Sequence, residues 1–245
     1  MRDKKSQAPR PITTEDHHDK IIDVFRRYKP GRILDACCGE GALTVRLEEL
    51  GYDVSCCDIQ PDLCKIPGKE VLPCDLNQRI PFEDNTFDYI ACTNVLHRLY
   101  GFDRAVSEIA RVLKPGGTAI ISLPNYSSIT RRMRYLFLGS ISDAVNTQKC
   151  RGNSTAPEAN FRNSLILPQL VLCLERHRLR IDHLEQDRFK RTSFFFAPLA
   201  LPIYIGSWLT ARPRRRDNRR LRWANHPMVL LGGPHIVIVA QKDAA

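Results

Sequence analysis

Acidic and polar residues follow several apolar runs of this sequence at a spacing that could bind a nucleoside. The apolar run 33–36 contains Asp35 and leads into a turn of small residues at 37–41, and about twenty residues later a second run ends at Asp58. Small residues let the backbone approach a ligand closely, and a carboxylate after the second run suits hydrogen bonds to a ribose diol. The spacing predicts a nucleoside-binding crevice at the carboxyl ends of parallel strands.

Two further apolar runs end in residues that suit the same crevice. Asp75 and Leu76 follow the run 71–74, where a carboxylate and an apolar side chain could flank a purine, and Asn94 follows the run 87–93. A tight turn without any ligand is the alternative reading of the glycines alone. Polar residues at the ends of four successive strands are difficult to assign to packing, so the pattern favours a nucleoside ligand.

The elements that must position these residues alternate between strand and helix along the chain. Apolar periodicity predicts strands over 32–36, 52–57, 71–74, 87–93, 118–123, 179–186 and 235–240, and helices over 15–28, 42–50, 102–113, 127–138 and 165–176. Residues 140–164 are polar and rich in helix breakers, which indicates a loop. The alternation predicts an α/β fold with a mostly parallel sheet and right-handed crossovers.

The run 33–125 resembles the class I S-adenosylmethionine-dependent methyltransferases, in the branch that carries motifs like those at 81–88 and 108–117. The resemblance implies a Rossmann-like, seven-stranded sheet with an antiparallel last strand and helices on both faces, in three layers. It also implies S-adenosylmethionine as the cofactor. We expect no metal, because the sequence has no CxxC pair to hold zinc. The cofactor-binding residues that it implies are Asp35, Cys37, Gly39 and Gly41 around the methionine part, Asp58 with its neighbour Ile59 at the ribose, Asp75 and Leu76 at the adenine, and Asn94 near the sulfonium.

Two positions depart from the usual pattern of this family. Cys37 stands where the family has glycine, and a thiol is small enough there if the backbone angle φ is not positive. His97 and Arg98 stand where the family commonly has Glu-His. His97 is a weak candidate for a general base near the acceptor, and a position on a helix surface is the favoured interpretation.

Composition indicates a reduced, cytoplasmic protein with a basic insertion. The nine cysteines are odd in number, include adjacent pairs and form no CxxC motif, so we interpret them as small core side chains. The first ten residues include four basic ones but no apolar core of signal-peptide length, which suggests a frayed tail. The segment 212–222 holds seven arginines and one aspartate, so it supplies +6 of the net charge of +10.

An apolar segment precedes that arginine cluster. Residues 194–209 carry no charge, are slightly short for a membrane span and contain two prolines. The favoured interpretation is a helix over the acceptor pocket followed by a solvated basic loop. The alternatives are docking at an anionic membrane surface through Phe194–Arg222, or RNA binding through the arginines.

The sequence therefore predicts one methyltransferase domain with elaborations. We divide it into a tail and helix at 1–30, a cofactor core at 31–125, acceptor-side elements at 126–187, the insertion at 188–233 and the last strand at 234–245. We expect methyl transfer to a small-molecule or a lipid- or glycan-linked acceptor. If the membrane-docking alternative holds, this reaction takes place at the inner membrane face. The alternatives are an RNA methyltransferase and a cofactor-binding partner or regulator without catalytic activity. The sequence does not indicate an oligomeric state.

Overall fold

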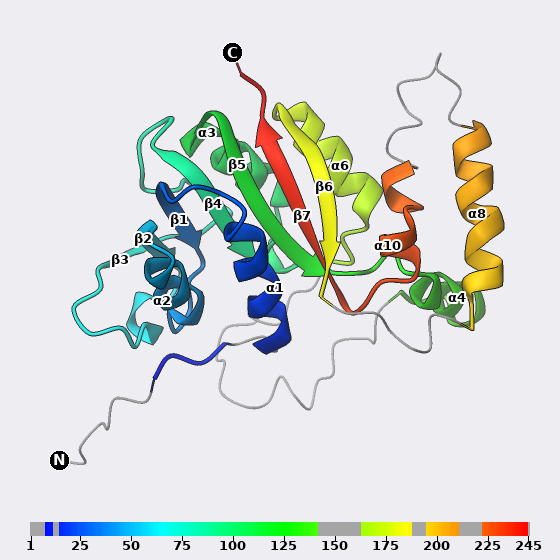
Figure 1. The fold of residues 1–245 in the computed structure, drawn as a ribbon, viewed down its shortest axis with the longest axis horizontal. Coiled ribbons are helices and arrows are strands. Elements are labelled where there is room, and N and C mark those ends of the chain that lie inside the picture. Colours follow the sequence, from blue (N-terminus) through cyan, green and yellow to red (C-terminus); the bar gives the residue numbers. More distant parts are fainter. Residues whose placement is uncertain (1–7, 12–14, 142–162, 188–194, 211–221, 245) are drawn as a thin grey trace.

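A seven-stranded sheet in the order β3-β2-β1-β4-β5-β7-β6 forms the centre of the protein (Figure 1). The computed structural model describes residues 8–11, 15–141, 163–187, 195–210 and 222–244. The strands are β1 Arg32–Ala36, β2 Asp53–Asp58, β3 Val71–Pro73, β4 Phe87–Thr93, β5 Leu113–Pro124, β6 Leu179–Gln186 and β7 His235–Lys242. Only β7 runs antiparallel to its neighbours β5 and β6, and the pairs among β1 to β5 are parallel. The predicted sheet is confirmed.

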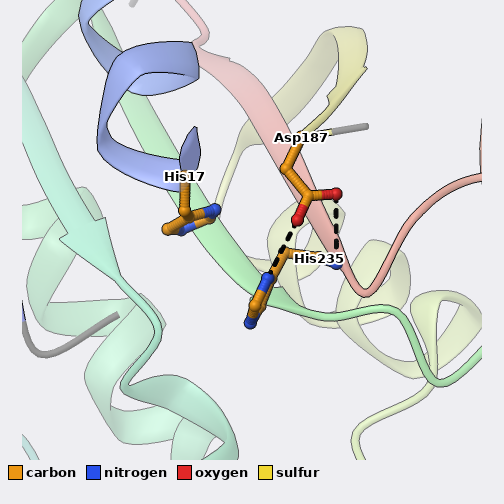
Figure 2. Close-up of side chains that lie close together, drawn as sticks. All are labelled: His17, Asp187 and His235. Atoms are coloured by element: carbon orange, nitrogen blue, oxygen red, sulfur yellow. Dashed lines mark hydrogen bonds and ion pairs between the residues drawn. The ribbon is translucent and has the colours of Figure 1, made fainter. Parts of the chain in front are cut away.

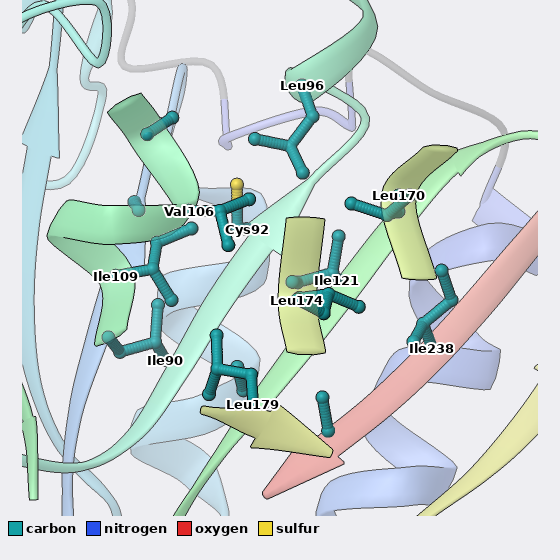
Figure 3. Packing of buried hydrophobic residues seen from close by; sticks show 14 of the residues in the cluster. Ile90, Cys92, Leu96, Val106, Ile109, Ile121, Leu170, Leu174, Leu179 and Ile238 are labelled. Atoms are coloured by element: carbon teal, nitrogen blue, oxygen red, sulfur yellow. The ribbon is translucent and has the colours of Figure 1, made fainter. Parts of the chain in front are cut away.

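Helices cover both faces of the sheet and complete the predicted three layers. On one face α1 (Glu15–Phe25) and α2 (Ala42–Glu49) bury their apolar sides against β1, β2 and β7. On the other face α3 (Phe102–Val112) and α6 (Leu167–Arg176) pack against β4, β5 and β7, as Figure 3 shows. The central strands are apolar on both sides because helices cover both sides.

Cysteines contribute to both core layers as small apolar side chains. Cys56 and Cys57 are adjacent on β2 and point into opposite apolar clusters, and Cys92 lies in the core beneath α3. All eight cysteines in the described part of the chain are free thiols, and six of them are buried. Their predicted role as core side chains is confirmed for those six.

Strand β5 begins five residues earlier than the sequence pattern predicts. The Lys114–Gly117 segment follows α3 as expected, but it lies inside β5. The register of the pairing between β4 and β5 shifts there, between Phe87 and Tyr89 of β4. Gly116 adopts a left-handed φ of 76°, which lets the strand bulge and continue instead of ending. The glycines therefore mark a bulge within the strand and not its boundary.

Three further helices lie at the end of the molecule beyond β6: α4 (Ile129–Leu138), α8 (Ala197–Thr210) and α10 (Pro227–Leu230) (Figure 1). Arg132 on α4 donates hydrogen bonds to Asn225 Oδ1 at 2.6 Å and to the Ala224 carbonyl at 2.7 Å, just before α10. Helix α8 packs against α10. No helix within the described residues is long and apolar enough to cross a membrane.

Two sequence predictions fall wholly or mostly outside the described residues. The arginine cluster at 212–222 does so except for Arg222, and the predicted loop at 140–164 does so except at its two ends. Residues 8–10 are the described part of the predicted free tail, and they lie at the protein surface. The Arg10 amide donates a hydrogen bond to Glu40 Oε2 at 2.9 Å.

Candidate functional site

A cavity of about 460 Å³ opens at the carboxyl ends of β1, β2, β3 and β4. The strand order reverses there, because β2 follows β1 on one side of it and β4 lies on the other. Open α/β sheets bind ligands at such a switch point. Eight of the nine predicted cofactor-binding residues line this cavity: Asp35, Cys37, Gly39, Asp58, Ile59, Asp75, Leu76 and Asn94.

Gly41, the ninth predicted residue, does not line the cavity but shapes its first loop. It precedes α2 with a φ of 89°, in the left-handed region that favours glycine. A Cβ atom at this position would lie 2.5 Å from Ile66 Cδ1, inside van der Waals contact. Gly41 therefore lets the segment around Ile66 pack closely against the start of α2.

Cys37 adopts a φ of 70°. A cysteine was expected to replace the family's glycine without cost only if φ were not positive, and this condition is not met. Left-handed backbone is costly for a residue with a Cβ atom. The conformation is held in place by the Cys37 amide, which donates a hydrogen bond to the Cys57 carbonyl at 2.8 Å. Burial raises the pKa of the Cys37 thiol well above its usual range, so the side chain is a neutral thiol in the cavity wall.

Asp58 is the acidic residue that the second strand delivers to the cavity. Its carboxylate accepts hydrogen bonds from the Gly39 amide and the Gln60 amide, each at 2.8 Å. These two bonds fix the orientation of a side chain that is 6% exposed. Each carboxylate oxygen has further lone pairs, so the group can accept two hydroxyl hydrogen bonds from a diol.

Asp35 lies at the end of β1 and is fully buried. The Thr44 hydroxyl donates to Asp35 Oδ2 at 2.7 Å, and Asp35 Oδ1 has no hydrogen-bond partner in the described structure. Burial raises the pKa of Asp35 to about 6, the nearby Asp58 charge adds to that rise, and the Thr44 hydrogen bond opposes it. A buried oxygen without a partner favours a ligand that donates a hydrogen bond to it.

The far wall of the cavity is built by Asp75, Leu76 and Asn77. Asp75 Oδ1 accepts hydrogen bonds from both the backbone and the side-chain amide of Asn77, each at 2.9 Å. Asn77 Oδ1 in turn accepts from the amides of Tyr100 and Gly101, which ties the loop after β3 to the loop after β4. Leu76 is buried beside them and offers an apolar surface.

Asn94 forms the floor of the cavity at the end of β4. Its φ is 57°, and its amide donates to Ser122 on the neighbouring β5, to the carbonyl at 2.9 Å and to Oγ at 3.1 Å. Asn94 Oδ1 is buried without a hydrogen-bond partner among the described residues. The floor therefore carries a second free acceptor, in addition to Asp35 Oδ1.

His97 is not where the favoured interpretation placed it. It lies in the short 3-10 helix Leu96–Arg98, is 4% exposed, and its ring faces Tyr126 at 6.5 Å between centroids. A helix-surface position is therefore wrong. His97 is also not among the residues that line the cavity, and its weak candidacy as a base stays a prediction.

Sequence reasoning missed the contribution of the N-terminal segment to this cavity. Arg10, Pro11 and His18 line it, and burial followed by the charge of Arg46 lowers the pKa of His18 to about 4. The available signal was the adjacent pair His17-His18 in an otherwise amphipathic helix, where polar residues fall on the apolar side. These two histidines are buried.

Comparison with known proteins agrees with this geometry. The profile of the family described as "Methyltransferase domain" matches residues 34–121, the segment that contains all four strand ends of the cavity. Residues 34–121 belong to that family. The resemblance to methyltransferases predicted from the sequence is confirmed for this segment.

Curated relatives match less than half of this chain. Demethylmenaquinone methyltransferase of Bacillus pumilus is 29% identical over 114 residues, which is 42% of this chain and 49% of the relative. The protein of that name from Listeria monocytogenes is 30% identical over 110 residues, or 40% and 46% of the two chains. The chain spans about half the length of the curated relatives that it matches.

Solved structures share the fold over nearly the whole chain. A protein from Pyrococcus horikoshii superposes with a TM-score of 0.59 at 18% identity, over 97% of this chain and 95% of that one. A SAM-dependent methyltransferase from Archaeoglobus fulgidus gives a TM-score of 0.54 at 17% identity, over 92% and 94%. The [4+2]-cyclase SpnF gives 0.55 at 19%, over 94% and 81%. Similarity at this level of identity establishes the fold alone. The reaction has to be inferred from the residues of the site.

The volume of the cavity and its hydrogen-bonding groups are compatible with S-adenosylmethionine. Its volume lies within the range of about 300–1,000 Å³ that is usual for small-ligand pockets. Asp35 Oδ1 and Asn94 Oδ1 are buried acceptors without partners, as a ligand carrying an ammonium group would require. Asp58 presents a fixed carboxylate to a diol.

Proposed function

We propose that this protein transfers the methyl group of S-adenosylmethionine to a small-molecule acceptor. The observation that carries the proposal is the cavity at four successive strand ends, with Asp35, Asp58, Asp75 and Asn94 on its walls. The bound cofactor supplies a methyl group on a sulfonium, which is already a strong electrophile. The protein must therefore hold the acceptor in line and exclude water.

The residues of the cavity divide the binding work between them in this proposal. Asp58 accepts hydrogen bonds from the ribose, and Asp35 and the 37–41 loop face the methionine part. Asp75 and Leu76 flank the adenine, because one offers a carboxylate and the other a buried apolar surface. Asn94 lies on the floor beneath the sulfonium.

We further propose that the acceptor is apolar and is collected at an anionic membrane surface. Helix α8 exposes large apolar side chains: Trp208 is 60% exposed and Leu201 and Leu209 are each 59% exposed. Exposed apolar side chains also run along the end of α4, at residues 135–138. Exposed apolar side chains, with Arg131 and Arg134 on the same helix α4, suit the boundary between head groups and acyl chains.

Two further facts support an interfacial role of α8 over a lid role. No residue of α8 lines the cavity, so the described structure does not place this helix over the cofactor site. The helix contains Pro202 and spans only Ala197–Thr210, which is too short to cross a bilayer. Demethylmenaquinone, the acceptor named for two relatives, offers a first compound for assay, since those relatives share the methyltransferase domain.

Transfer of radiolabelled methyl from S-adenosylmethionine to a cell extract tests the activity. The extract is separated into lipid, small-molecule, RNA and protein fractions, and Asp58→Asn serves as the inactive control. Label in the lipid or small-molecule fraction supports the proposal. Label in RNA overturns it in favour of an RNA methyltransferase, and no label above the Asp58→Asn control overturns it in favour of a cofactor-binding partner or regulator.

Flotation with vesicles tests the membrane surface separately. We expect the protein to float with anionic vesicles and the double variant Trp208→Ser, Leu209→Ser to float roughly tenfold less. Leu172→Ser on α6 removes an apolar side chain that is 47% exposed elsewhere on the protein and should float like the wild type. A wild-type protein that does not float, or equal losses in both variants, would refute this part.

A further inference from the structure

Three ligand-type side chains from three separate elements meet at the carboxyl edge of the sheet. His17 comes from α1, Asp187 directly follows β6, and His235 begins β7 (Figure 2). One nitrogen of each imidazole and one carboxylate oxygen lie within 4.8 Å of one another. None of the three belongs to the cofactor motifs or lines the cofactor cavity.

Asp187 and His235 are already in contact with each other. Asp187 Oδ2 lies 3.1 Å from His235 Nδ1, and Asp187 Oδ1 accepts a hydrogen bond from the His235 amide at 3.4 Å. The Asp187 side chain is 1% exposed and that of His235 is 17% exposed.

The hydrogen-bonded pair of Asp187 and His235 does not explain why His17 is buried beside it. It is fully buried, its ring lies 4.7 Å from that of His235 between centroids, and its Nε2 lies 2.8 Å from Ser122 Oγ. Its Nδ1 is buried without a hydrogen-bond partner in the described structure. Ligating histidines commonly use one nitrogen for the metal and have the other hydrogen-bonded to a neighbouring group.

We propose that His17, Asp187 and His235 bind one divalent transition-metal ion of the zinc class. Two imidazoles and one carboxylate form a usual donor set for such ions, with bonds of about 2.0–2.2 Å. Tetrahedral bonds of that length place donor atoms about 3.4 Å apart, so atoms up to 4.8 Å apart need to approach by at most about 1.4 Å, which side-chain rotation can supply. The ion would join α1 to the β6–β7 pair.

The site adjoins the floor of the cofactor cavity without being part of it. Ser122 Oγ contacts His17 Nε2 on one side and accepts a hydrogen bond from the Asn94 amide on the other. An ion bound to His17 would thus fix Ser122 as well. The inference stands whether or not the protein transfers methyl groups, because it rests on these three side chains alone.

Titration of the metal-free, full-length chain with Zn²⁺ and Co²⁺ tests the proposal. We expect one equivalent to bind, the Tm to rise, and the Co²⁺ spectrum to lack a thiolate-to-metal band because no cysteine belongs to the site. His17→Gln and Asp187→Asn should each weaken binding by about 10–100-fold. Cys173→Ser, in the second cluster of Asp103, Cys173 and His177, is the matched control and should bind like wild type.

Two results would overturn the proposal: no saturable binding by the wild type, or unchanged binding in both His17→Gln and Asp187→Asn. Loss of binding in Cys173→Ser alone would assign the ion to the other cluster and also overturn it. Asp187→Asn keeps the size of the side chain, so it decides the question if His17→Gln fails to fold. Binding of S-adenosylhomocysteine by each variant confirms that the fold is retained.

Discussion

The part of the molecule between β1 and β5 and the part beyond β5 differ in which side chains their strands and helices bury and expose. Between β1 and β5, short loops deliver buried polar side chains to one cavity, and residues such as Asp58 are held by backbone amides. Beyond β5, helices α4 and α8 leave large apolar side chains exposed, and their polar contacts serve to join elements, as Arg132 does. The first half therefore forms a cavity lined by polar groups, and the second half forms an exposed apolar surface.

This contrast predicts that small changes are costly in the first half and tolerated in the second. Gly41→Ala should lower the free energy of unfolding by about 2–4 kcal/mol, because the new Cβ atom would meet Ile66 and the backbone is left-handed. Urea denaturation measures the difference. Gly68→Ala is the matched control: φ is 72° but no atom lies within 4 Å, so only the smaller conformational cost applies. Equal losses in both variants would refute the packing role of Gly41.

Asp35 should make the first half sensitive to pH. Its folded pKa of about 6 lies above the ordinary value of 3.8, so the folded state holds this proton more tightly than the unfolded state does. Stability from this group therefore falls as pH rises from about 4 to about 6 and stays low above that. Relative to wild type, Asp35→Asn should gain ~2 kcal/mol between about pH 4.5 and about pH 7.5 in urea denaturation.

Other titrating groups, including the buried histidines His17 and His18, are common to both proteins and cancel in this comparison. A difference between the wild type and Asp35→Asn that does not change with pH would show that Asp35 titrates normally. It would also remove the argument that Asp35 Oδ1 is a buried acceptor for a hydrogen bond from the ligand.

Gly206 provides the opposite test in the second half. It lies inside α8, and a Cβ atom there would meet nothing within 4 Å. Gly206→Ala should stabilise the protein by about 0.5–1 kcal/mol, since alanine loses less conformational entropy in a helix. A Tm that falls in thermal unfolding would mean that α8 is packed as tightly as the cofactor half.

The sequence predicted the cofactor half well because its signals are local. Strands β1 and β4 have the predicted bounds, since a buried parallel strand reads as a short apolar run. Eight of nine predicted residues meet in one cavity because carboxyl ends of parallel strands share an edge. The left-handed φ of Cys37 was not predictable, because a cysteine gives no local sign of it.

Contacts between distant segments account for what the sequence missed. His18 reaches the cofactor cavity from α1, and His17 on the same helix meets His235 more than two hundred residues later. The bulge in β5 depends on pairing with Phe87 and Tyr89 on β4, whereas the glycines alone resemble a strand boundary. The acceptor side has no local motif, since a surface for apolar molecules needs only exposed apolar residues.

Calorimetric titration with S-adenosylmethionine tests the central claim most directly, through Asp58→Asn and its control Asp62→Asn. The amide keeps the size of Asp58 but loses the charge and one acceptor oxygen that the ribose diol requires. Asp62 is an exposed acid four residues away, outside the cavity. We predict micromolar binding by the wild type and Asp62→Asn and at least ~30-fold weaker binding by Asp58→Asn. Equal affinity in all three proteins, or no binding by the wild type, would contradict the account.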